Sequence, residues 1–142
     1  MFEAYKPNYE LWKIEFEKNK VDENTILVWH SCGWWFIVRW LSENFHVIPK
    51  KVILVAPWLD PESSKKNNFF DFKIQPNIKD SNWKITIFES TNDSGDVQES
   101  IKILQNVLEN SVLKTFKNYW HFCYNDFWTQ EFPELLKEVL NF

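Results

Sequence analysis

The chain has 142 residues, of which 44% are hydrophobic and 18% aromatic, and its formal net charge is −4. This length suits one domain with a substantial core, and such an apolar content excludes a disordered chain. The acidic balance and the scattered Lys and Arg residues argue against a nucleic-acid partner, and no apolar run is long enough to cross a membrane. With no signal-peptide pattern, and with two cysteines, Cys32 and Cys123, in no disulfide or zinc motif, we predict one cytoplasmic domain over residues 1–142.

Helical and strand-like patterns alternate along the sequence. Helices are expected where apolar residues recur every three or four positions, and strands where short aliphatic runs end at turn residues such as Pro57. Residues 60–84 are irregular, with one short helical turn expected near Phe69–Phe72. In chain order, the expected elements are the helix Asn8–Asn19, the strand Thr25–Trp29, the helix Gly33–Phe45, the strands Lys51–Ala56 and Lys84–Glu89, the helix Ser94–Glu109, the strand Val112–Phe116 and the helix Glu131–Leu140.

The expected strands are apolar almost throughout, which is typical of strands that are covered on both faces. Their alternation with helices favours a parallel sheet between two layers of helices. We therefore predict an α/β fold, a three-layer domain with about four parallel strands and flanking helices.

The segment Trp29-His30-Ser31-Cys32-Gly33 links the first expected strand to a helix. It resembles the G-x-S-x-G turn that exposes the nucleophilic serine of α/β-hydrolases, with tryptophan in place of the first glycine. At such a turn, the amino end of the helix and the Cys32 N–H favour developing negative charge. The alternative is that Ser31 only caps the helix. The Cys32 thiol is interpreted as a packing group.

A serine nucleophile needs a histidine base that is oriented by a carboxylate. The third expected strand runs into a turn with Asp93, and the fourth runs into a loop with His121. Both loops follow the carboxyl ends of parallel strands, as Ser31 does, so the three side chains are expected at one edge of the sheet. Asp96 is the alternative acid. Two alternative interpretations remain: Asp93 could cap the next helix, and His121 could have only a packing role.

Three further stretches resemble one known family. They are VILVAPWLD over residues 52–60, WHF over residues 120–122 and EFPELL over residues 131–136. Together with the serine turn, they are similar to the small serine-hydrolase family of the α/β-hydrolase superfamily, of the YdeN and retinoblastoma-binding protein nine type, from about Tyr9 onward. The resemblance implies a catalytic set of Ser31, Asp93 and His121. The Cys32 N–H is the expected oxyanion donor, and no motif in the sequence implies a cofactor or a metal.

Two features depart from that family. The chain holds 2 glycines and 9 tryptophans, and it is expected to lack the family's first strand–helix unit, which supplies a second oxyanion donor. Large rings at positions where the family favours small residues would refill the space of a missing unit. We hypothesise an engineered, N-terminally truncated hydrolase scaffold with weak or no activity. The rings in question belong to Trp29, Trp34, Trp35, Trp120 and Trp128.

Two alternatives stay open beside that hypothesis. The first is an active small-ester hydrolase, and the second is a non-catalytic interaction module that uses an aromatic surface or an exposed strand edge. The strand Thr25–Trp29 is expected at the edge of the sheet, where unpaired backbone groups favour a homodimer. His30 and His46 are interpreted as structural or surface residues.

Overall fold

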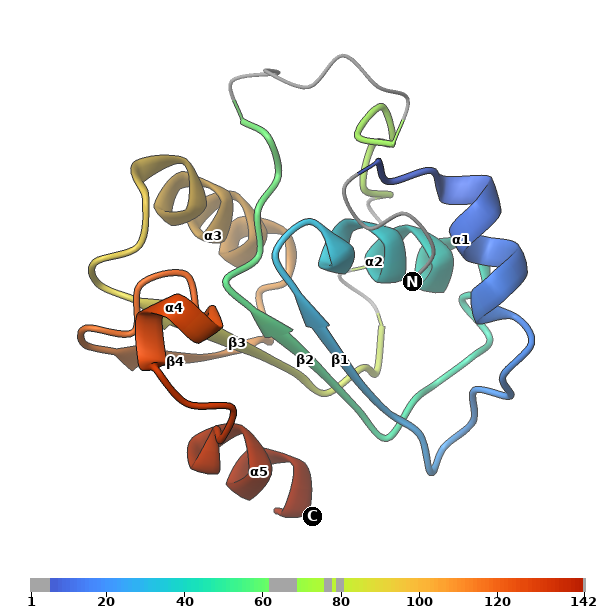
Figure 1. Cartoon of the computed structure of the whole chain (residues 1–142). Coiled ribbons are helices and arrows are strands. Elements are labelled where there is room, and N and C mark those ends of the chain that lie inside the picture. The colour runs from blue at the N-terminus through green and yellow to red at the C-terminus, as the bar shows by residue number, and fades with distance from the viewer. Residues whose placement is uncertain (1–5, 62–68, 76–77, 79–80, 142) are drawn as a thin grey trace.

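The computed structural model describes residues 6–61, 69–75, 78 and 81–141. Its centre is one sheet of four parallel strands, which follow one another in space in the order of the chain (Figure 1). The predicted α/β fold with about four parallel strands is confirmed. The strands are β1 (Ile26–His30), β2 (Lys51–Val55), β3 (Ile85–Ser90) and β4 (Val112–Phe116).

Helices cover both faces of the sheet and make the predicted three layers. In Figure 1, α1, α2 and α3 lie on one side of the strands and α5 lies on the other. Alternate residues of β2 serve the two layers, since Val52 and Leu54 join the larger core and Ile53 and Val55 join the smaller one beneath α5. The helices are α1 (Tyr9–Phe16), α2 (Gly33–Glu43), α3 (Gly95–Val107), the short α4 (Tyr124–Phe127) and α5 (Pro133–Leu140).

The helix α5 is fixed to the sheet by the buried side chain of Glu138. Its carboxylate accepts hydrogen bonds from Lys51 Nζ and Thr86 Oγ1, each at 3.0 Å, and from Lys114. A buried carboxylate costs little stability only when it is paired and hydrogen-bonded in this way. Residues from β2, β3 and β4 therefore hold α5 against the second face.

One local prediction was wrong, and one short helix was not predicted. Phe69 and Phe70 form a turn and a bend, and no helix includes them or Phe72. The helix α4 was also not expected, because four residues are too few for a periodic pattern. This helix begins with a local cap, in which the Cys123 N–H donates to Asp126 Oδ2 at 2.8 Å. Part of the irregular segment 60–84 lies outside the described residues.

The tryptophans that were expected to pack together beside β1 have different surroundings. Trp34 and Trp35 are buried, but their indole N–H groups donate to the carbonyls of Trp58 and Phe69, at 2.9 and 2.7 Å, in the segment that follows β2. Trp120 and Trp128 are 56% and 78% exposed, so the prediction that they repack a core was wrong.

The ring that does pack beside β1 is Trp29. Its centroid lies 5.8 Å from that of Phe16 on α1 and 5.2 Å from that of Phe36 on α2. The predicted edge position of the strand is confirmed for the described residues, in which β1 pairs with β2 alone and stands at the end of the sheet. Val28 at the middle of this edge is 41% exposed.

Candidate active site

Ser31 stands at a sharp turn between β1 and α2. Its backbone N–H donates to the carbonyl of Val55 at 3.0 Å, which continues the pairing of β1 with β2 by one residue. Its φ is +52°, in the left-handed region that costs a residue with a side chain about 1–3 kcal/mol. This strained strand-to-helix turn is the backbone geometry of a nucleophile elbow.

Gly33 makes the turn possible by lacking a side chain. A Cβ at this position would lie 2.9 Å from Cε3 of Trp29, closer than carbon atoms approach without displacement. The turn therefore keeps the second glycine of G-x-S-x-G because the large ring of Trp29 fills the space that the first glycine would leave open.

The structure brings Ser31, His121 and Asp93 into one chain of hydrogen bonds. His121 Nε2 lies 2.9 Å from Ser31 Oγ, and His121 Nδ1 lies 3.0 Å from Asp93 Oδ2. A carboxylate only accepts hydrogen bonds, so Nδ1 carries the proton and Nε2 is left to accept from the serine hydroxyl. The neutral imidazole is thus in the tautomer that a general base requires.

The electrostatics of this chain favour a protonated His121 after proton transfer. Its hydrogen bond to Asp93 raises the pKa of the imidazole above the usual 6.5, although burial acts in the opposite direction. The side chain of Asp93 is only 3% exposed, so water screens this interaction weakly. A second bond, from the Ser94 N–H to Asp93 Oδ1 at 2.7 Å, fixes the carboxylate.

Asp96, the alternative acid, is directed elsewhere. Its Oδ2 accepts from the indole N–H of Trp58 at 2.7 Å, and its Oδ1 accepts from the Val97 N–H at 3.1 Å. Hydrogen bonds from the hydroxyl of Ser94 and from Trp58 lower the pKa of this carboxyl, so it is ionised at neutral pH. Asp96 supplies negative charge near the site, while Asp93 faces the histidine.

Cys32 lies between Ser31 and α2 and has a partly buried thiol. Burial raises the pKa of this thiol, which disfavours the thiolate that a cysteine nucleophile would need. The residue caps the amino end of α2, where the first backbone N–H groups have no partner within the helix. Its N–H is therefore suited to an oxyanion that forms at Ser31.

The loop that carries His121 is tied to the carboxyl end of β3. The Tyr119 N–H donates to Ser90 Oγ at 3.0 Å, and the Trp120 N–H donates to Asn92 Oδ1 at 3.1 Å. Ser90 and Asn92 are also joined to each other at 2.6 Å. Sequence reasoning missed both residues, and their only signal was a position in the short stretch between the third expected strand and Asp93.

His30 was interpreted as a structural or surface residue, and sequence reasoning did not connect it with the site. Its Nε2 lies 2.7 Å from the carbonyl oxygen of His121. The signal available in the sequence was its position next to Ser31.

An open cavity of about 440 Å³ adjoins the hydrogen-bonded chain. Ser31 and His121 line it, together with the rings of Trp58 and Trp120 and the carboxylates of Asp96 and Asp126. A small ester would fit beside the serine hydroxyl in a space of this size.

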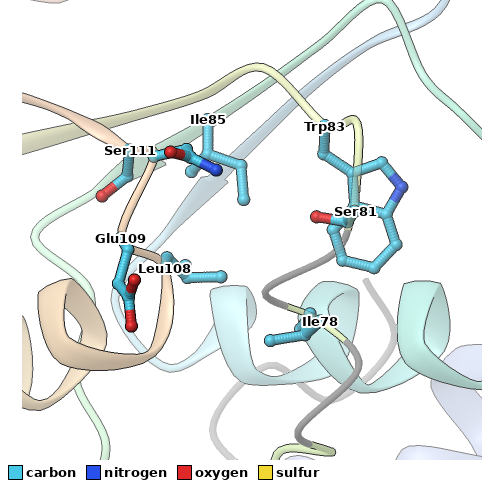
Figure 2. A pocket seen from close by; sticks show the side chains of 8 residues that line it. Ile78, Ser81, Trp83, Ile85, Leu108, Glu109 and Ser111 are labelled. Carbon is cyan, nitrogen blue, oxygen red and sulfur yellow. The ribbon is translucent and has the colours of Figure 1, made fainter.

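A second hollow lies at the other end of the sheet, where β3 and β4 begin (Figure 2). Ile78, Trp83, Ile85 and Leu108 are among its lining residues, and its volume of about 10 Å³ corresponds to about one water molecule. It is too small and too far from Ser31 to take part in the chemistry.

Comparison with known proteins assigns the family. A family model described as "Serine hydrolase" matches residues 2–122. The chain belongs to the serine hydrolase family. A comparison of its sequence with curated proteins found no match.

Three solved structures have a similar fold. The ydeN gene product of B. subtilis superposes with a TM-score of 0.74 at 21% identity, over 98% of this chain and 78% of that one. A predicted CIB-like hydrolase from Thermoplasma acidophilum gives 0.60 at 15% identity, over 92% of this chain and 55% of that one. The third structure is MGS-MChE2, an alpha/beta hydrolase enzyme from the metagenome of sediments of the Mar Chica lagoon in Morocco. It superposes with a TM-score of 0.57 at 17% identity, over 92% of this chain and 65% of that one.

These matches are informative about the fold and the family. The chain spans about half of the Thermoplasma protein and about two thirds of the Mar Chica enzyme. In the described part of the chain, no helix is both long and apolar enough to cross a membrane. The same residues contain no group of three or more His, Cys, Asp or Glu side chains that could hold a metal ion.

Proposed function

We propose that this chain is a serine hydrolase that cleaves small esters through a covalent acyl-enzyme. The observation that carries the proposal is the continuous chain from Ser31 Oγ to His121 and on to Asp93, with its two links of 2.9 and 3.0 Å. The strained φ of Ser31 and the adjoining cavity support it.

In the proposed reaction, Ser31 Oγ attacks the ester carbonyl while its proton passes to His121 Nε2. The carbonyl oxygen becomes negative and is stabilised by the Cys32 N–H and by the amino end of α2. The C–O bond to the alcohol then breaks, and His121 returns the proton to the leaving oxygen. Water hydrolyses the acyl-serine by the same steps, with His121 again as base. Asp93 orients the imidazole throughout and stabilises its charged form.

The competing proposal is that the site is a remnant within an engineered, truncated scaffold. It is favoured by the Trp29 ring, whose Cε3 lies 2.9 Å from the place that a Cβ at Gly33 would take and so restricts the turn at the nucleophile. The two proposals therefore differ in the rate at which Ser31 reacts.

Covalent labelling by a fluorophosphonate probe, read by intact mass, tests both proposals. The functional proposal expects one label per chain, lost in Ser31→Ala and in His121→Ala. Ser111→Ala is the matched control, because this serine lies in the hollow at the opposite end of the sheet and should label as the unaltered chain does. Labelling of the unaltered chain no faster than that of Ser31→Ala would refute the hydrolase and support the scaffold.

A further inference from the structure

The serine and the histidine come from opposite edges of the sheet. Ser31 follows β1 at one edge, and His121 lies in the loop after β4 at the other. Neighbouring strands are about 4.8 Å apart, so the two strand ends are separated by three spacings, or about 14 Å. The loop after β4 must therefore cross the carboxyl ends of β3 and β2 before His121 reaches the serine.

This crossing segment is strained. Asn118, Trp120 and Phe122 all have positive φ, at 63°, 44° and 57°. Each such residue costs about 1–3 kcal/mol and keeps its conformation only when surrounding contacts enforce it. The bonds from Ser90 and Asn92 enforce the part of the loop that lies over β3. At the far end of the loop, the His121 imidazole bonds to Asp93 and the His121 carbonyl accepts a weak bond from Cys123 Sγ at 3.7 Å. Neither bond ties the backbone of this end to β1.

His30 supplies a contact at that far end. Its Nε2 lies 2.7 Å from the carbonyl oxygen of His121, and the two imidazole rings lie 4.9 Å apart between centroids. A carbonyl oxygen only accepts, so the Nε2 of His30 must carry the hydrogen. Because His30 precedes Ser31 directly, the end of β1 fixes both the nucleophile and the backbone of the base.

We propose that His30 is a positioning residue, which sets the distance between Ser31 Oγ and His121 Nε2 by anchoring the crossing loop to β1. This proposal rests on the proposed function for its kinetic consequence, and on the observed geometry for its structural one. Without this bond, the backbone of His121 would lose its link to β1, and the imidazole would be positioned only through its bonds to Asp93 and Ser31 and the contacts of the loop with β3. A displacement of about 1 Å at reacting atoms can cost about 10²-fold in rate.

The kinetic test compares His30→Ala with His30→Gln, whose side-chain amide can still donate to a carbonyl. His46→Ala is the control, because this exposed histidine lies in the loop between α2 and β2. With p-nitrophenyl acetate as substrate, His30→Ala should lower kcat about 10–100-fold with little change in KM. The Gln variant should recover most of the loss, and His46→Ala should match the unaltered chain.

A spectroscopic measurement separates this proposal from the proposed function. The proton on His121 Nδ1, held by Asp93, gives a far-downfield imidazole resonance in the proton NMR spectrum, with or without turnover. His30→Ala should broaden or remove it, and His30→Gln should keep it. An unaltered chain that shows the resonance but never labels would refute the hydrolase and leave the positioning role intact.

Three results would overturn the positioning role. One is a folded His30→Ala variant with unchanged resonance and unchanged labelling rate. Another is an equal loss in the Ala and Gln variants that follows their loss of thermal stability, since that pattern indicates a general structural role. The third is an unaltered chain that shows no such resonance, because the arrangement that His30 is proposed to hold would then be absent.

Discussion

The contact between Gly33 and Trp29 gives a prediction whose size can be worked out. Gly33→Ala would put a carbon atom 2.9 Å from Trp29 Cε3. Ordinary carbon contacts are about 3.5–4.0 Å, so the overlap is about 0.6–1.1 Å. The ring cannot turn away easily, because Phe16 and Phe36 pack against it.

Overpacking of this kind costs about 1–3 kcal/mol. The gain in helix propensity from glycine to alanine is at most about 1 kcal/mol, and it is smaller at the first residue of a helix. We therefore expect Gly33→Ala to lower the free energy of unfolding by about 1–2 kcal/mol, which corresponds to a fall in Tm of about 2–8 °C for a chain of this size.

A double-mutant cycle with Trp29→Phe isolates the contact. Phenylalanine lacks Cε3 and Cζ3, the ring atoms at 2.9 and 3.5 Å, and keeps an atom equivalent to Cδ2 at 4.0 Å. Urea titrations of the four proteins should show that Gly33→Ala costs almost nothing when it is combined with Trp29→Phe. Equal costs with and without the tryptophan would refute the reasoning and point to strain elsewhere in the turn.

Further outcomes are expected for the site and for the sheet edge. Because Asp93 raises the pKa of His121 and only the neutral imidazole accepts the serine proton, kcat/KM should rise with pH through a pKa above 6.5, and Asp93→Asn should lower that pKa. The ion pair of Asp93 with protonated His121 stabilises the fold fully below pH 6.5, and this contribution is lost as the pH rises through the raised pKa of His121. In urea titrations, Asp93→Asn should therefore lower the free energy of unfolding more near pH 6 than near pH 9. Asp96 and Asp126 line the cavity, so kcat/KM for an ester that carries a carboxylate should be about tenfold lower than for a neutral analogue. Asp126→Asn and added salt should both reduce this difference. A ratio of the two kcat/KM values that does not change with salt would contradict the prediction. The exposed β1 edge predicts a homodimer that Val28→Lys dissociates, and a monomeric mass at every concentration in sedimentation would count against it.

The sequence was sufficient for the fold because the fold depends on patterns. Apolar strands alternating with helices determine a parallel sheet, and such a sheet brings the loops that carry Ser31, Asp93 and His121 to one edge. No knowledge of side-chain conformation was needed for that step. The choice between Asp93 and Asp96 did need it, because both lie in one turn and differ only in which group each carboxylate meets.

The missed features depend on conformations that a pattern does not encode. The contact of His30 with His121 requires a crossing loop with several positive φ values at residues other than glycine, which no periodicity predicts. The hydrogen bonds of Trp34 and Trp35 to the segment after β2 were not predicted for a related reason. The helix α2 is apolar almost all round, so its sequence does not specify which side faces which neighbour.

The link between Ser31 and His121 also joins the first and last strands of the sheet. Adjacent strands are rotated by about 20–25°, so three pairs accumulate a twist of about 60–75° between β1 and β4. A change in that twist would therefore change the distance between Ser31 Oγ and His121 Nε2. If the chain is the hydrolase proposed above, we expect substitutions in the middle of β2 or β3 that alter this twist to alter the rate at which Ser31 is labelled, although they lie far from the cavity. We likewise expect a covalent label on Ser31 that also contacts His121 to slow hydrogen exchange in all four strands.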